Sequence, residues 1–116
     1  MATRSSPYPE QQLCRRAMGW ALRLKVNPEQ VQVRRLPGKW GSCTPDGVVT
    51  LADDLATKGV NFQDYVIVHE LLHLKYRDHG KRFKAMMTAL VPNWRELERS
   101  SRHSTERALD KGGDAP

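Results

Sequence analysis

The chain has 116 residues, of which 39% are hydrophobic, and a formal net charge of +6, with a mean hydropathy of −0.65. This length fits a single domain with a modest core, and no apolar run approaches the roughly 20 residues that a membrane span needs. The two cysteines lie far apart, which excludes a disulfide framework and a Cys-type zinc site. Because the N-terminus lacks the apolar core of a signal peptide, we expect a cytoplasmic protein.

The first predicted element is an amphipathic helix over residues 10–25. Its apolar residues recur at helical spacing: Leu13, Ala17, Trp20, Ala21 and Leu24. Asn27-Pro28 is expected to end it, because the residue before a proline avoids helical geometry. We expect residues 1–9, which contain two prolines, to form a flexible arm.

Three short strands are predicted next. Apolar and polar residues alternate over 31–36, which is typical of a half-buried strand. Strands over 40–44 and 48–51 flank Pro45-Asp46-Gly47, a turn signal that predicts a hairpin. The neighbouring carboxylates Asp53 and Asp54 invite an acid/base role, but we favour a cap on a short turn over 54–58.

The strongest helical pattern covers residues 61–77, with Asp64 contributing charge near its start. This segment is apolar around most of its circumference, which predicts a helix buried in the middle of the domain. Helices over 81–90 and from Pro92-Asn93 to about residue 102 complete one domain over 10–102. We expect residues 103–116 to form a disordered tail.

Three of the four histidines lie within the stretch HELLHLKYRDH. His69 and His73 are one helical turn apart on the same face, so both imidazoles can reach one point. Glu70, rotated by about 100° from His69, can approach that point without binding the ion. Two histidines that hold Zn²⁺ beside a carboxylate that acts on water form the HExxH pattern. A catalytic zinc site needs a third protein ligand.

The third ligand is expected to be His79, but helical geometry alone does not bring it to the site. A continued helix would place it roughly 9 Å beyond His73 along the axis. The chain must therefore turn back, and Arg77-Asp78, before Gly80, is where we expect the turn. Metzincins have the same histidine spacing with a glycine at the turn, where this chain has Tyr76. The pattern is therefore not that of a metzincin.

The stretches KWGSCTPDGVVTLADDL, DYVIVHELLHLKYRDHGKRFKAMM and VPNW resemble the YgjP-like metallopeptidase domain, related to the WLM and SprT-like families. The resemblance covers about residues 35–94. Lys39 stands where the family commonly has arginine, and Lys84 where it often has an aromatic residue. The resemblance implies an α+β fold: a minimal zincin-like domain with a small antiparallel or mixed sheet, the HExxH helix and flanking helices.

The resemblance also implies site residues. Zinc is bound by His69, His73 and His79, and Glu70 is the general base and acid. In zincins a sheet edge receives the polypeptide substrate as an added strand, and here either Gly47–Leu51 or Trp40–Cys43 is expected to serve. Candidate substrate-binding residues are therefore Trp40, Gly41 and Ser42, with core packing as the equal alternative for Trp40. Cys43 is expected to be a small buried residue rather than a ligand.

The sequence therefore predicts a zinc metalloprotease that hydrolyses peptide bonds with Glu70 acting on water. One alternative is a DNA-associated protease, as in some SprT- and WLM-like proteins, which would use the net charge and the Lys81-Arg82-Phe83-Lys84 cluster. The other is a non-catalytic interaction module stabilised by zinc. The carboxylate of Glu70 beside His69 argues against that module, since a structural site has no use for it.

Overall fold

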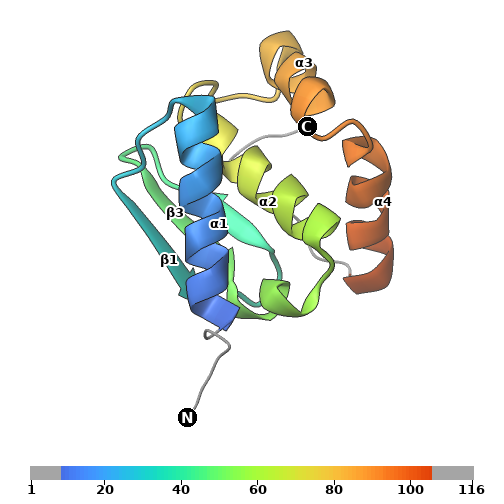
Figure 1. Ribbon diagram of the computed structural model, residues 1–116. Coiled ribbons are helices and arrows are strands. Elements are labelled where there is room, and N and C mark those ends of the chain that lie inside the picture. The colour runs from blue at the N-terminus through green and yellow to red at the C-terminus, as the bar shows by residue number, and fades with distance from the viewer. Residues whose placement is uncertain (1–8, 106–116) are drawn as a thin grey trace.

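The computed structural model describes residues 9–105 and shows an α+β domain of four α-helices, one short 3₁₀ helix and three strands (Figure 1). The predicted fold class is confirmed. The elements in chain order are α1 (Pro9–Leu24), β1 (Gln30–Arg34), β2 (Gly41–Cys43), β3 (Val48–Ala52), the 3₁₀ helix η1 (Asp53–Thr57), α2 (Val60–Leu72), α3 (Lys81–Leu90) and α4 (Trp94–Thr105). The proposed arm and tail lie outside the described residues, except that Pro9 belongs to α1 and residues 103–105 belong to α4.

The sheet is mixed, with the strand order β1-β3-β2. β2 and β3 form the predicted antiparallel hairpin, and Gly47 in its turn has φ +98°, which favours glycine. β1 pairs with β3 in parallel. β3 is therefore the central strand, so the alternative in which Gly47–Leu51 receives the substrate at a sheet edge is wrong. The edge strand of the hairpin is β2.

Helix α1 packs one face on the sheet and on α2. The five residues that its spacing marked as apolar are all buried. The helix ends at Leu24, before the predicted Asn27-Pro28 stop, because Lys25 adopts a left-handed conformation with φ 59°. The amides of Lys25 and Val26 then bond to carbonyls of the last turn, at Leu22 and Ala21, in the pattern of a Schellman motif.

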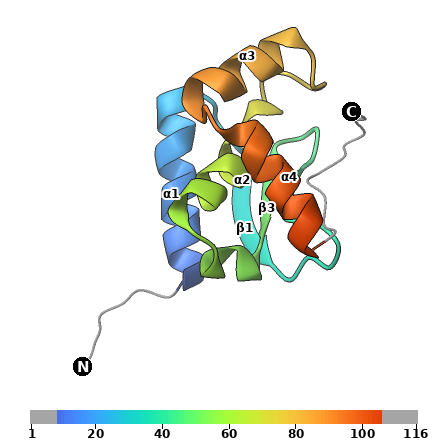
Figure 2. The ribbon, with the colours of Figure 1, turned by 90° about the vertical axis from the view of Figure 1, so that its right-hand side faces the viewer.

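Helix α2 lies in the middle of the domain, as predicted. Figures 1 and 2 show it between α1 and α4, with α3 at one end, and Tyr65 through Leu72 are all buried. Asp64 lies near the start of α2, just after its first turn. Its carboxylate accepts hydrogen bonds from Arg16 at 2.7 Å and from the Trp20 indole at 2.9 Å, and these bonds connect α1 to α2.

The expectation that Asp53 and Asp54 cap the short turn is wrong. The short helix η1 begins at Asp53 and its N-cap is Ala52, with no side-chain cap hydrogen bond. Asp54 contributes its backbone carbonyl, which accepts from the Thr57 hydroxyl at 2.7 Å. No helix in the described part of the chain is both long and apolar enough to cross a membrane.

Candidate metal centre

The buried end of α2 carries the first two groups of the site. His69 and Glu70 lie in the last turn of the helix, with exposed fractions of 8% and 0%. His73 follows as the C-cap and is 3% exposed. Burial of three such polar groups is costly unless they bind something. Their placement together at one end of a central helix therefore indicates a functional site.

Helix α2 ends at Leu72, earlier than the predicted end at Arg77, and the chain then turns over 73–75 and bends again at Arg77-Asp78, where the turn was expected. The amides of Leu74, Lys75 and Tyr76 bond back to Leu71 and Leu72 in a tightened last turn. The guanidinium of Arg77 donates to the His73 carbonyl at 3.2 Å and so satisfies one open helix end. Positive φ values in the described chain occur at Lys25, Gly38 and Gly47, so this turn needs no glycine.

The same turn orients the His73 ring. Its Nδ1 lies 3.1 Å from the Tyr76 carbonyl oxygen. Because a carbonyl oxygen only accepts, Nδ1 carries the hydrogen, and Nε2 is left with a free electron pair. A hydrogen bond of this kind fixes the tautomer of metal-binding histidines in general. Tyr76 therefore contributes its backbone, a role that the sequence does not reveal.

The turn brings His79 back to the other two histidines. His79 Nε2 lies 3.0 Å from His73 Nε2, and the ligand nitrogens of His69, His73 and His79 all lie within 4.8 Å of one another. Two nitrogens on one tetrahedral zinc ion are about 3.3 Å apart, given bond lengths of about 2.0–2.1 Å. The structure thus brings together the three histidines that the sequence named.

His69 is suited to binding a metal ion in its neutral form. Burial, with smaller contributions from His73 and His79, holds the pKa of His69 well below its ordinary value of 6.5. Its buried Nε2 has no hydrogen-bond partner among the described residues. An unpaired buried nitrogen costs about 1–3 kcal/mol, and a metal ion at this point would remove that cost. The donor set therefore fits zinc.

The lowered pKa of His69 predicts how the stability of the metal-free protein depends on pH. Unfolded His69 takes up a proton below about pH 6.5, whereas the folded residue stays neutral, so stability is full above this pH and falls as the pH drops towards the folded pKa. We expect a loss of up to about 1.4 kcal/mol per pH unit. Urea unfolding with a chelator present, between pH 7.5 and 4.5, measures it. The loss should shrink in His69→Gln, and equal pH slopes in both proteins would contradict the assignment.

Phe83 of α3 packs against the whole histidine cluster. Its ring centroid lies 5.0 Å from that of His69, 5.1 Å from His73 and 4.7 Å from His79. The ring is 2% exposed and stacks on His73 with an interplanar angle of 30°. Phe83 therefore holds the three imidazoles in position. Its sequence signal is the apolar spacing of Phe83 and Met87 on a helix that directly follows His79.

Glu70 lies against the edge strand of the hairpin. A Cβ placed on Gly41 would sit 3.0 Å from Glu70 Cγ and 3.2 Å from its Oε2. The carboxylate thus fills the space beside the strand that was expected to bind substrate. It is not a member of the histidine cluster, in which each ligand atom comes from an imidazole.

The remaining predicted site residues are spread over the core and the sheet edge. Trp40 is 1% exposed and meets the Phe62 ring edge-on at 5.2 Å, as the core-packing alternative expected. Ser42, on the edge strand, is half-buried. Cys43 is buried and lies outside the histidine cluster, as predicted.

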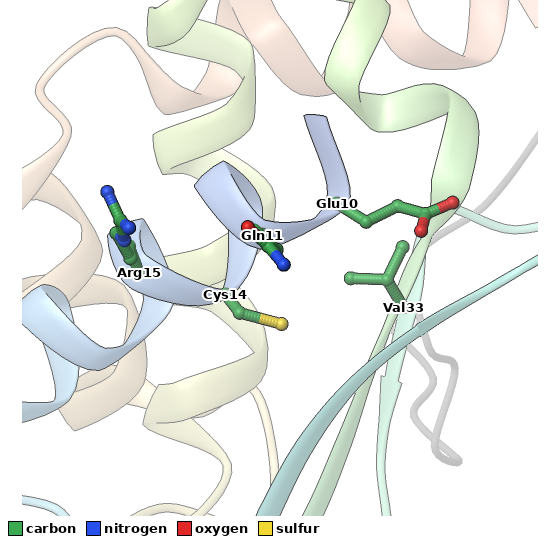
Figure 3. A pocket seen from close by; sticks show the side chains of 5 residues that line it. All are labelled: Glu10, Gln11, Cys14, Arg15 and Val33. Carbon is green, nitrogen blue, oxygen red and sulfur yellow. The ribbon is translucent and has the colours of Figure 1, made fainter. Parts of the chain in front are cut away.

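A hollow of about 540 Å³ lies between the first turns of α1 and strand β1 (Figure 3). It is lined by Glu10, Gln11, Cys14, Arg15 and Val33. Burial and the nearby Glu10 carboxylate raise the pKa of the Cys14 thiol, which makes it a poor nucleophile. None of the three clustered histidines lines this hollow.

Known metallopeptidases resemble this chain in sequence and in fold. A sequence model described as the YgjP-like metallopeptidase domain matches residues 8–103. Among solved structures, the metallopeptidase zymogen abylysin of Pyrococcus abyssi superposes with a TM-score of 0.70 at 21% identity, covering 85% of this chain and 97% of its own. The zymogen jannalysin of Methanocaldococcus jannaschii gives 0.68 at 17% identity, covering 78% and 94%. No curated protein sequence matches the chain.

Proposed function

Because the chain belongs to the YgjP-like metallopeptidase-domain family, we propose that it is a zinc-dependent peptidase with Glu70 as its general base. The observation that carries the proposal is the convergence of three imidazoles, with the fully buried Glu70 next to His69 in the last turn of α2. A site that only stabilised the fold would need the histidines but not Glu70. This is the reason for preferring an enzyme to a zinc-stabilised interaction module.

The chain's own residues have separate roles in this proposal. His69, His73 and His79 would hold the ion, and the hydrogen bond from His73 to the Tyr76 carbonyl and the Phe83 ring keep them oriented. Zinc, when bound, supplies a Lewis acid that acidifies water and polarises the substrate carbonyl. Glu70 takes a proton from the attacking water and passes it to the nitrogen of the leaving amine.

The polypeptide substrate is proposed to bind along β2. Among the described strands β2 pairs with β3 alone, which places it at the sheet edge on the α2 side of the hairpin, where a zincin would receive an extended peptide. Helix α2 contacts β2, and the Glu70 side chain lies against Gly41 of that strand. A peptide on this edge would therefore pass close to the general base. Ser42, which is half-buried, would face the same peptide.

Metal removal tests the proposal. We expect a chelator to stop digestion of an unfolded protein substrate, and stoichiometric zinc to restore it. The same zinc should stabilise the fold, by about 2.7 kcal/mol at a concentration 100 times the dissociation constant. Metal analysis, thermal unfolding and digestion of one preparation measure all three. Stabilisation by zinc without any digestion would favour the interaction module instead. The DNA-associated protease stays a prediction.

A further inference from the structure

We propose that Gly41 is a positioning residue for Glu70: the lack of a side chain at this point of β2 leaves the space in which the carboxylate lies. The inference deepens the proposed function, on which the role of Glu70 as a base rests. Gly41 was expected to bind substrate, whereas here it makes room for the carboxylate of Glu70.

The backbone conformation does not explain a glycine here. The described glycines with positive φ are Gly38 and Gly47, so another residue could adopt the backbone angles of Gly41. Gly41 pairs with Leu51 in the sheet, and a glycine inside a strand weakens the strand unless something approaches its backbone closely. The group that approaches is Glu70.

The distances show that a methyl group would displace Glu70. Carbon atoms in ordinary contact lie about 3.5–4.0 Å apart, whereas a Cβ at position 41 would lie 3.0 Å from Glu70 Cγ. It would also lie 3.3 Å from the Thr50 carbonyl oxygen, on the neighbouring strand. Because the backbone of the sheet is held by its hydrogen bonds, the side chain of Glu70 is the group that moves. Its complete burial means that it moves by disturbing packed neighbours.

Gly41→Ala should therefore damage catalysis more than binding. The contact requires the Glu70 side chain to give by a few tenths of an ångström; since a misplacement of about 1 Å costs on the order of 100-fold in rate, we expect kcat to fall by about 3- to 10-fold. Zinc affinity should stay unchanged, because the atoms nearest to a Cβ at position 41 belong to Glu70 and Thr50 and not to a histidine. KM should change by less than about threefold. Gly19→Ala is the matched control: a Cβ there meets nothing within 4 Å, so kcat should stay at the wild-type value.

A double-mutant cycle tests the contact without using activity. In the metal-free protein, Gly41→Ala should raise the unfolding equilibrium constant when Glu70 is present. In a Glu70→Ala background the factor by which it raises this constant should be smaller, by on the order of tenfold. The cost that remains in that background measures the contact with Thr50. Equal effects in both backgrounds, or a fall in zinc affinity that accounts for the lost rate, would overturn the inference. Absence of hydrolysis by the wild type would instead overturn the proposed function, so the two failures are told apart.

Discussion

Glu70→Gln is expected to abolish peptide hydrolysis while leaving the metal in place. Glutamine has the size of glutamate but cannot accept a proton from water, so the rate should fall by on the order of 10²- to 10⁴-fold, the usual contribution of a general base. The three imidazoles supply every ligand atom of the candidate metal site, so the metal content of the variant should be unchanged. Digestion of an unfolded protein by metal-loaded variants, with metal analysis of each sample, measures both quantities.

The stability of the Glu70→Gln variant gives a second, independent readout. Glu70 is 0% exposed, and an amide costs less to bury than a charged carboxylate. We therefore expect the variant to be at least as stable as the wild type, so lost activity cannot be attributed to unfolding. Glu96→Gln, which changes an exposed carboxylate on α4, is the control and should keep full activity. Retained hydrolysis in Glu70→Gln would remove the general-base assignment.

Much of the architecture could be predicted because it follows from apolar spacing. The buried face of α1 and the buried character of α2 appear directly in the sequence, since each helix has to cover its apolar residues. The hairpin also could be predicted, because Gly47 marks a turn that requires positive φ. The parallel pairing of β1 with β3 could not, because it joins strands that are not consecutive in the chain.

The end of α2 shows where apolar spacing misleads. Leu71, Leu72 and Leu74 continue the helical pattern, so the sequence predicts a helix up to Arg77. The actual end at Leu72, with His73 as the C-cap, is held by side-chain contacts: the His73 ring with the Tyr76 carbonyl and the Arg77 guanidinium with the His73 carbonyl. Such contacts leave no periodic signal. The early end resolves the difficulty with His79, because five residues of turn and loop, rather than a continued helix, separate it from His73.

The role of Gly41 was hidden for a related reason. The sequence places a glycine on a strand near the expected substrate, and from this position alone substrate binding is the natural prediction. Only the packing of α2 on β2 shows that Glu70 lies beside it. Phe83 is similar, since its contact with three histidine rings depends on how α3 folds back over α2. Residues that support a site through packing can be identified only from the tertiary structure.

His79→Ala is expected to remove the metal without unfolding the domain. The variant leaves two imidazoles, so zinc affinity should fall by more than the 10- to 100-fold typical of losing a hydrogen-bond partner around a ligand. His79 is half-buried and lies in the loop before α3, so the unfolding free energy of the metal-free protein should change little. Competition with a chromophoric zinc chelator measures the affinity, and urea unfolding measures the stability.

His73→Ala separates the two roles of that residue from the single role of His79. It should lose zinc as strongly and should also destabilise the metal-free protein, because its Nδ1 contact with the Tyr76 carbonyl holds the turn. Tyr76→Phe is the matched control: it keeps the carbonyl, so zinc affinity should stay at the wild-type value. If His79→Ala bound zinc as tightly as the wild type, the third ligand would have to be another residue. The turn at His73 would then have a purely structural role, which the 3.0 Å approach of the two Nε2 atoms argues against.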